Sequence, residues 1–458
     1  SARYFEYLRD QVVSHSVNVA SPHYIGHMTS SLPAFVRPLG RLITTLNQNL
    51  VKIETSKALT PYEREALAMM HRLVFGESGS FYARSIQDPD RTLGIMTSGG
   101  TLANVTALWV ARNASLGPSG AFEGVEREGL ASALRHHGFE RAVIIGSSLM
   151  HYSIEKAADL LGLGTKGIVR VPVGADGRVI TSALREAVAN AEERRELVLA
   201  VVGIAGTTDA GTIDPLAEIA DVASAARAHF HVDAAWGGPL LFSDRHRSAL
   251  AGIERADSVT IDGHKQLYLP MGIGMVLFKD PELARAIEKQ AAYIIRAGSP
   301  DLGRRALEGA RPGMALFLHA ALHILGKQGY AHLIDEGMAK AAFMASVIRD
   351  RPDLELLLEP QINIVDYRHL PAPYREKARA GALTEADEAA IDAFNVRLQE
   401  RQKQDGLTFV SRTTLAFTAR APGRPIVALR AVLANPLTEE RHILEVLDRQ
   451  RKLAAELP

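Results

Sequence analysis

The stretch SVTIDGHKQLYLPMGIGM, Ser258–Met275, begins with an apolar run typical of a buried strand and then reaches His264 and Lys265. A glycine-containing run follows the lysine and indicates that the strand ends there. In open α/β sheets the carboxyl ends of the strands face the ligand crevice, and an amine held there can react with an aldehyde. A lone lysine at a strand exit is far more often a surface residue, so the interpretation needs support from the rest of the chain.

Around this stretch, from residue 93 to residue 279, short apolar runs alternate with segments of helical period, which predicts a mainly parallel sheet covered by helices. Seven strands are expected, over Leu93–Met96, Ala142–Gly146, Ile168–Pro172, Val198–Ile204, Phe230–Asp233, Ser258–Ile261 and Gly274–Phe278. Helices are expected over 102–112, 154–161, 182–194 and 215–227. Asp214 is the expected N-cap of the last helix, with Pro215 at its first position.

The flanking segments differ from this central region. Residues 1–59 carry few strand signals, and Thr60–Phe75 is expected to form a helix with Thr60 as N-cap and Glu63 completing a capping box. A helical pattern follows Gly313, and further strands are expected over 363–367, 408–411 and 426–429. We therefore expect an N-terminal segment over 1–59, a large domain over 60–328 and a smaller C-terminal α/β domain over 329–458.

The composition is that of a globular protein without nucleic-acid or membrane partners. Of the 458 residues, 47% are hydrophobic, and 52 basic residues balance 52 acidic ones, so electrostatics favour neither nucleic acid nor anionic membranes. The absence of cysteine excludes thiolate catalysis and cysteine-ligated metals. No apolar run reaches the roughly 18 residues that span a bilayer, and Ser1–Asp10 has no basic region followed by an apolar stretch. A soluble, cytoplasmic protein is expected.

A second strand end carries a carboxylate. In HVDAAWGG, His231–Gly238, Asp233 ends an apolar strand, where a carboxylate is costly to bury unless it is paired. A pyridine nitrogen that faced it would stay protonated and act as an electron sink. A turn-forming Asp explains the residue equally well in isolation, but Ala234 and Ala235 leave room for a flat ring.

Glycines separate the first strand from its helix. In MTSGGTLANVTALWVAR, Met96–Arg112, the backbone amides of Ser98, Gly99, Gly100 and Thr101 can bind a phosphate at the start of a helix. Glycine-rich loops are common between strands and helices, so this signal is weak by itself. The stretch lacks the lysine of a P-loop and the spacing of a dinucleotide fingerprint, which disfavours nucleotide hydrolysis and NAD binding.

Two more strand ends carry polar side chains. His151 follows the second strand and can stack on an aromatic cofactor, or it can bond to the backbone where a helix begins. Thr207 and Thr208 follow the fourth strand, where a hydroxyl can contact a ring oxygen or cap the loop. Since all five features lie at the carboxyl ends of expected parallel strands, one crevice can gather them.

Taken in order, the phosphate loop, His151, Thr208, Asp233 and the Asp-Gly-His-Lys string resemble the group II decarboxylases that use pyridoxal 5'-phosphate (PLP). The resemblance covers nearly the whole chain. It implies the fold of the PLP-dependent transferases, fold type I, with a seven-stranded, mostly parallel sheet in the large domain. It also implies an amino acid substrate and a homodimer whose N-terminal strings wrap across the two-fold axis. Separately, no metal site is expected from the sequence.

The resemblance also implies roles for individual residues. Lys265 is expected to hold the cofactor covalently, Asp233 to bind the pyridine nitrogen and His151 to stack on the ring. Further cofactor contacts are expected from Ala235, Thr208, His264, Ser98, Gly99, Gly100 and Thr101. Tyr293 corresponds to a loop tyrosine that returns a proton to the substrate carbon. Neither Asp262, where some relatives have Asn, nor Arg311, near the crevice or the subunit boundary in relatives, receives a role.

Three strings are most similar to those of the bacterial pyridoxal-dependent aspartate 1-decarboxylases: SPHYIGHMTSSLP (Ser21–Pro33), NQNLVKIETSKALTPYE (Asn47–Glu63) and IDGHKQLYLPMGIG (Ile261–Gly274). The similarity implies α-decarboxylation of L-aspartate to β-alanine and CO2, in the service of pantothenate synthesis. His27 and Thr55 are the expected substrate contacts. Lys52, Lys57 and Arg296 are further candidates for binding an acidic side chain.

Several alternatives stay open. Glutamate differs from aspartate by one methylene, worth roughly 1 to 3 kcal/mol in a pocket, and the pattern does not separate the two substrates. An aromatic amino acid decarboxylase and a catalytically idle PLP-binding protein are the other candidates, although an idle scaffold needs neither Lys265 nor Asp233. His23 and His27 have the spacing of helical metal ligands, but no third histidine or acidic partner lies near them in the sequence.

Overall fold

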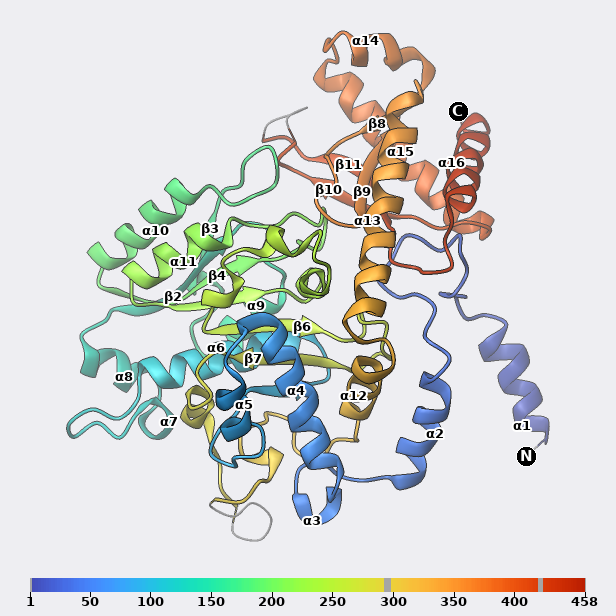
Figure 1. The fold of residues 1–458 in the computed structure, drawn as a ribbon. Coiled ribbons are helices and arrows are strands. Elements are labelled where there is room, and N and C mark those ends of the chain that lie inside the picture. Colours follow the sequence, from blue (N-terminus) through green and yellow to red (C-terminus); the bar gives the residue numbers. More distant parts are fainter. Residues whose placement is uncertain (1, 292–297, 419–422, 458) are drawn as a thin grey trace.

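The computed structural model describes residues 2–291, 298–418 and 423–457, and two sheets organise them (Figure 1). The strands of the larger sheet are β1 (Gly94–Thr97), β2 (Arg141–Ser147), β3 (Ile168–Val171), β4 (Glu196–Ile204), β5 (His229–Asp233), β6 (Ser258–Asp262) and β7 (Gly274–Phe278). The strands of the smaller sheet are β8 (Leu354–Leu356), β9 (Ile364–His369), β10 (Ser411–Leu415) and β11 (Ile426–Val432).

The larger sheet has the order β1-β7-β6-β5-β4-β2-β3. Strands β2 to β6 pair in parallel, whereas β7 is antiparallel to both β6 and β1. The predicted seven-stranded, mostly parallel sheet is therefore confirmed, with an antiparallel β7 that the sequence did not indicate. Because helices cover both faces, the inner strands are apolar runs such as ELVLAVVGI in β4, and not alternating patterns.

Helices lie on both faces of this sheet. The helices between Leu59 and Ala225 are α4 (Leu59–Phe75), α5 (Gly79–Ser85), α6 (Gly100–Ser115), α7 (Val125–Glu128), α8 (Leu130–His137), α9 (Ser153–Leu160), α10 (Thr181–Glu193) and α11 (Leu216–Ala225). Helices α6 and α9 share one core with Ala142 and Ile144 of β2, while α10 and α11 share the other with Val143 and Ile145. Alternate residues of one strand thus support the two layers.

Two expected helix caps are wrong although both helices exist. Helix α11 begins at Leu216, and the Asp214 carboxylate instead accepts hydrogen bonds from the backbone N–H groups of Val179 (2.8 Å) and Ile204 (3.0 Å). Burial raises the pKa of Asp214 to about 6. Helix α4 begins at Leu59, and the hydroxyl of Thr60 bonds to that of Ser56 at 2.5 Å. In both places the side chain expected to cap the helix forms hydrogen bonds with groups outside that helix instead.

The C-terminal part contains α12 (Ala315–Ile324), α13 (Gly326–Asp350), α14 (Arg375–Arg379), α15 (Glu385–Asp405) and α16 (Glu440–Ala455). The smaller sheet packs against α13, α15 and α16, whereas α12 packs against α4. Figure 1 shows α13 running from beside α12 up to the small sheet, so it passes through the boundary expected at residue 328. Strand β8 was not expected, and β10 begins at Ser411, where the strand expected over 408–411 ends.

The N-terminal segment contains α1 (Ala2–Tyr7), a π-helical turn (Leu8–Val13), α2 (Val36–Leu46) and α3 (Ile53–Ser56). Between α1 and α2 the chain is fastened to the C-terminal part. The N–H of Ile25 donates to the carbonyl of Phe409 at 3.0 Å, and the Asn435 amide donates to the carbonyl of Ser21 at 2.9 Å. Across the described ranges, no helix is long and apolar enough to cross a membrane.

Arg311, which the sequence analysis left without a role, forms a buried ion pair with α4. Its Nη1 donates to Oε2 of Glu63 at 2.6 Å and its Nη2 donates to Oε1 of the same carboxylate. The Glu63 side chain is 1% exposed and that of Arg311 is 10% exposed. The Arg311 carbonyl also accepts the N–H of Leu50, so this pair joins the N-terminal segment, α4 and the start of α12.

Replacing Glu63 with Gln is expected to lower the free energy of unfolding by about 3 kcal/mol or more, because the Arg311 guanidinium then stays buried without a counter-charge. Urea unfolding followed by circular dichroism measures the change. The matched control is Glu123→Gln, which breaks an exposed pair with Arg127 and is expected to cost less than about 1 kcal/mol. Equal losses in the two variants would show that the Glu63 pair is not a structural anchor.

Candidate active site

A cavity of about 470 Å³ lies at the carboxyl ends of the parallel strands, where the sequence analysis placed the ligand crevice. The structure brings eleven of the predicted site residues to its wall: His27, Ser98, Gly99, Gly100, Thr101, His151, Thr208, Asp233, Ala235, His264 and Lys265. They come from the N-terminal segment and from the ends of β1, β2, β4, β5 and β6. The volume suits a small aromatic cofactor with a small substrate.

Lys265 lies on the turn that follows β6, with its side chain 19% exposed to the cavity side. Its Nζ is 3.0 Å from Oδ2 of Asp262, the last residue of β6. The other oxygen of Asp262 is buried and has no hydrogen-bond partner within the described residues. Tyr268 closes the turn with a left-handed φ of +56°, and its N–H donates to the carbonyl of Lys265. The turn thus holds the amine beside a carboxylate with spare acceptor capacity.

The glycine loop leaves space that side chains would fill. A Cβ on Gly100, the first residue of α6, would lie 2.7 Å from Oδ2 of Asp262 and 3.3 Å from Cβ of Ala235. A Cβ on Gly274 of β7 would lie 2.6 Å from Cα of Gly99. Ser98, Gly99, Gly100 and Thr101 line the cavity, so the N-terminus of α6 borders the space where a phosphate can bind.

The carboxylate of Asp233 is buried at the end of β5 and receives two hydrogen bonds. Nδ2 of Asn104, on α6, donates to Oδ2 at 2.8 Å, and the N–H of Ala235 donates to Oδ1 at 3.2 Å. These donors offset part of the cost of burying a negative charge. Each oxygen keeps a lone pair for a further donor in the cavity.

Asn104 belongs to a buried hydrogen-bond chain. Burial lowers the pKa of His231 to about 4, so its imidazole is neutral. Its Nδ1 lies 2.8 Å from the hydroxyl of Ser258 and its Nε2 lies 3.0 Å from Oδ1 of Asn104. Because that amide oxygen can only accept, the Nε2 of His231 carries the proton, and the amide nitrogen is left facing Asp233. The chain therefore fixes the orientation of the amide that binds Asp233.

The side-chain amide of Asn104 also orients His151, through the hydroxyl of Ser153. Nδ2 of Asn104 also donates to the hydroxyl of Ser153 at 2.9 Å, and that hydroxyl lies 2.9 Å from Nδ1 of His151. The Ser153 N–H also donates to Nδ1 at 3.3 Å, which leaves the imidazole proton on Nε2. Burial lowers the pKa of His151. A neutral imidazole with a fixed orientation at the cavity wall suits stacking on an aromatic cofactor. The bond from the Ser153 N–H is the backbone contact that the sequence offered as the alternative role of His151, so both roles are compatible.

Two residues of the cavity wall come from the smaller sheet, Ile364 of β9 and Arg430 of β11. Arg430 donates from Nε to the carbonyl of Asp209 at 2.9 Å, and Nη1 lies 3.4 Å from the hydroxyl of Ser411. Within the described part of the chain its Nη2 makes no hydrogen bond. Neither Arg430 nor Asn104 was predicted from the sequence. Asn104 could have been predicted, because an amide on the apolar face of a helix needs a buried hydrogen-bond partner. A single arginine within a strand, such as Arg430, carries no comparable sign of function.

A buried carboxylate stands beside this arginine. Asp366 of β9 is the register partner of Arg430, so the two side chains leave the sheet on the same face. Burial raises the pKa of Asp366 to about 8, with Arg430 opposing the shift and Asp209 adding to it. At neutral pH Asp366 is therefore mostly protonated, and the positive charge of Arg430 is not neutralised by it.

Among the described residues, Thr55 is the predicted site residue that the structure does not bring to the cavity. The hydroxyl of Thr55 lies within hydrogen-bond distance of the carbonyl oxygens of Asn49 (2.8 Å) and Lys52 (2.9 Å). Tyr293 and the substrate candidate Arg296 lie outside the described residues. Lys52, another candidate for binding an acidic substrate, pairs with Glu54 at 2.5 Å.

The model of the pyridoxal-dependent decarboxylase conserved domain matches residues 5–369. The chain belongs to the pyridoxal-dependent decarboxylases. It is 47% identical over 454 residues to the aspartate 1-decarboxylase of Aliivibrio fischeri, which covers 98% of this chain and 82% of that protein. It is also 30% identical to the L-2,4-diaminobutyrate decarboxylase of Acinetobacter baumannii, covering 94% of this chain and 82% of the relative. The enzyme is a carboxy-lyase, as the sequence analysis expected.

Solved structures agree with the fold of this decarboxylase. A crystal structure of mouse CSAD superposes with a TM-score of 0.86 at 26% identity, covering all of this chain and 89% of that chain. The Oryza sativa TDC with PLP and tryptamine has a TM-score of 0.83 at 23% identity and covers 99% of this chain and 88% of its own. The expected fold type I is confirmed.

The cofactor of this family is pyridoxal 5'-phosphate, and the cavity residues fit it. Lys265 supplies an amine for the aldehyde, and Asp233 supplies an acceptor for a protonated ring nitrogen. The glycine loop leaves room for a phosphate.

Replacing Gly100 with Ala is expected to weaken PLP binding by about 10- to 100-fold, since its Cβ would press on Asp262 and Ala235 and overpacking costs roughly 1 to 3 kcal/mol. Titration of the cofactor-free enzyme with PLP, followed by visible absorption, measures the affinity. The control is Gly79→Ala at the start of α5, where a Cβ meets nothing within 4 Å. An unchanged affinity in the Gly100 variant would mean that the cofactor does not approach this loop.

Proposed function

We propose that this decarboxylase converts L-aspartate to β-alanine and CO2. The observation that carries the proposal is the 47% identity, over 98% of the chain, to a protein named aspartate 1-decarboxylase. The β-alanine would supply pantothenate synthesis, and the cytoplasm stays the expected location.

The cavity offers a cation for an acidic substrate. Among the cavity-lining residues that the structure describes, Arg430 is the only arginine, and its Nη2 is available for a carboxylate. A guanidinium is the side chain best suited to hold a carboxylate with a fixed geometry. His27 serves less well as a cation, because burial and the nearby charges of Arg430, Lys265 and His264 lower its pKa. We therefore assign the recognition of a substrate carboxylate to Arg430, with His27 as a neutral hydrogen-bonding neighbour.

The other residues act through position and proton control. PLP, when bound, supplies the electron sink for the bond that breaks at the substrate α-carbon. Asp233 holds a proton at the pyridine nitrogen, and its orientation comes from Asn104. His151 would lie against one face of the ring and Ala235 against the other. Ser98, Gly99, Gly100, Thr101 and His264 would hold the phosphate, and Thr208 would supply a hydroxyl to a ring oxygen.

Lys265 would hold the cofactor through its amine, and the same side chain would be placed to take or give a proton near the substrate α-carbon. Tyr293 stays the proposed donor of the proton that replaces CO2, by resemblance to the family. Thr55 stays a proposed substrate contact. The assignment of Thr55 requires its hydroxyl to leave the carbonyl oxygens that it now approaches.

A homodimer is part of the proposal. The N-terminal segment exposes large apolar side chains, among them Phe5 (68% exposed), Val13 (66%) and Val17 (66%), which a solvated helix does not need. In Figure 1 α1 projects away from the two sheets. A second copy of the chain would cover these side chains, in agreement with the wrapping of N-terminal strings in the group II enzymes. The division at residues 59 and 328 likewise stays a proposal.

A panel of amino acids assayed for CO2 release tests the substrate. Release from L-aspartate with β-alanine as product is expected, at a kcat/KM at least about 10-fold above that for glutamate, since one methylene is worth roughly 1 to 3 kcal/mol. Lys265→Ala is expected to abolish both turnover and the visible absorption of the bound cofactor.

The outcomes of that panel separate the alternatives. Release only from glutamate or from an aromatic amino acid would replace aspartate as the substrate. No release from any amino acid, with the cofactor spectrum intact, would favour an idle PLP-binding protein. An unchanged spectrum in the Lys265 variant would refute the assignment of the anchoring amine.

Asp366 should make aspartate binding depend on pH. Above pH 8 its carboxyl ionises and offsets the charge of Arg430, so the KM for aspartate is expected to rise there by several-fold. In Asp366→Asn the neighbour is neutral at every pH, and this rise is expected to disappear while kcat keeps its profile. Comparing the two enzymes at the same pH removes the titration of the substrate from the result. Identical KM profiles would show that Asp366 does not act on Arg430.

A further inference from the structure

Outside the active site, two clusters of histidine and glutamate side chains have the composition of a zinc site. One joins His23 of the N-terminal segment to His442 and Glu445 of α16, and the other joins Glu65 of α4 to His319 and His323 of α12. In each cluster one ligand atom per residue lies within 4.8 Å of the others. Two histidines and a glutamate form a known ligand set for Zn²⁺.

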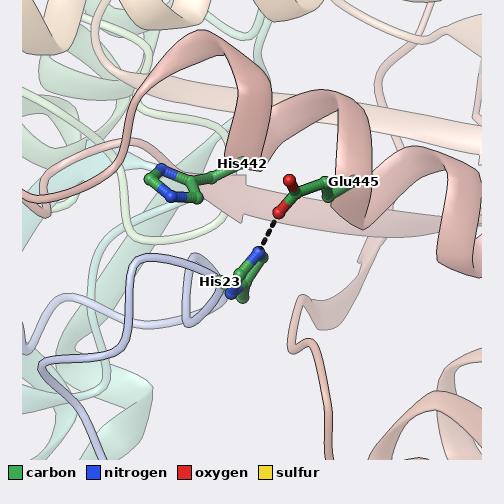
Figure 2. Close-up of side chains that lie close together, drawn as sticks. All are labelled: His23, His442 and Glu445. Atoms are coloured by element: carbon green, nitrogen blue, oxygen red, sulfur yellow. Dashed lines mark hydrogen bonds and ion pairs between the residues drawn. The ribbon is translucent and has the colours of Figure 1, made fainter.

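In the first cluster the side chains already bond to the protein. Figure 2 shows the ring of His23 pointing at Glu445, and its Nε2 lies 2.5 Å from the carboxylate. Nδ1 of His442 accepts the N–H of Glu439 at 3.0 Å, at the start of α16. A neutral imidazole that accepts at Nδ1 carries its proton on Nε2 and has no free lone pair there for a metal. The hydrogen bond from His23 to Glu445 and the cap at the start of α16 account for this cluster.

The second cluster lies between two helices that pack against each other, α4 and α12. His319 and His323 are four residues apart on α12, so their side chains share one face, and their ring centroids are 4.4 Å apart. Glu65 faces them from α4. Nε2 of His319 is 3.3 Å from Oε2 of Glu65.

That distance is long for a charge-assisted hydrogen bond, which is usually about 2.7 to 2.9 Å. It equals the separation of about 3.3 Å that two ligands have on a tetrahedral zinc ion with bonds of about 2.0 to 2.1 Å. The ring of Tyr62 packs edge-on against His319, with centroids 4.8 Å apart, and limits its rotation. Within the described residues His323 makes no hydrogen bond, so its ring can turn towards the other two ligands.

We propose that Glu65, His319 and His323 form a binding site for a divalent transition-metal ion, Zn²⁺ in the first instance, that fastens α12 to α4. A water molecule would complete the tetrahedron. The half-exposed carboxylate leaves an entry path from solvent, since the Glu65 side chain is 43% exposed and that of His319 is 14% exposed. The site is separate from the cofactor cavity, because none of its residues lines that cavity.

The test measures zinc bound to the PLP-loaded enzyme by equilibrium dialysis after treatment with a chelator. Wild type is expected to bind one Zn²⁺ per subunit at this site and to show a higher Tm in zinc. His319→Gln/His323→Gln is expected to lose this ion and the Tm shift, and Glu65→Gln to bind it at least about 10-fold more weakly. The matched control is His23→Gln/His442→Gln, which removes two histidines from the first cluster and should keep both the ion and the shift.

Visible absorption of the cofactor in each sample shows that zinc has not gone to PLP, and circular dichroism shows that the variants are folded. If the double variant at α12 fails to fold, Glu65→Gln and the Co²⁺ spectrum of wild type decide, because nitrogen ligands in a tetrahedral site give intense visible bands. Absence of bound zinc in wild type would overturn the proposal. Equal zinc in wild type and the α12 variant, or loss only in the His23/His442 control, would also overturn it.

Discussion

The active site depends on the hydrogen bond from Asn104 to the buried carboxylate of Asp233. A carboxylate at the end of an apolar strand is stable only if donors face it, and a catalytic carboxylate must also keep a lone pair for its ligand. The side-chain amide of Asn104 meets both needs. Its oxygen bonds to His231, so its nitrogen faces Asp233 and donates to one carboxylate oxygen, and lone pairs of the carboxylate stay free for a ligand. The neutral state of that histidine, set by burial, decides which end of the amide faces Asp233. The hydrogen-bonding capacity of the Asp233 carboxylate in the cavity is thus set by buried residues between α6 and β5.

The same cavity needs both sheets. The parallel strands of the larger sheet bring the amine, the carboxylate and the glycine loop to one edge, as the topology of open α/β sheets requires. The smaller sheet adds Arg430, whose Nε donates to the carbonyl of Asp209, which follows β4 of the larger sheet. Recognition of the substrate carboxylate is therefore assigned to the smaller sheet and the cofactor contacts mainly to the larger one. Changes in the small domain could retune which acid is bound without disturbing the cofactor.

Features that depend on neighbouring residues in the chain were predicted correctly from the sequence. The seven strands were predicted because each is a short apolar run between turn residues, and the glycine loop, Asp233 and Lys265 because each directly follows such a run. Asp214 shows the limit. Its carboxylate was expected to cap the helix beside it, but it binds the backbone N–H groups of Ile204, at the end of β4, and of Val179, 35 residues earlier in the chain. The roles of Arg430 and Asp366 could not be predicted from the sequence either. The two residues are neighbours only because β9 pairs with β11, and their sequence separation gives no sign of that pairing.

The histidine pairs show why spacing alone is an incomplete guide. His23 and His27 are four residues apart, which places two side chains together only on a helix. Their segment is not helical, and the two rings separate: His23 bonds to Glu445, whereas His27 lines the cofactor cavity. His319 and His323 have the same spacing inside α12, and there the rings do lie side by side. The third ligand, Glu65, is 254 residues from His319 in the sequence, so packing of two helices is what turns a spacing into a candidate metal site.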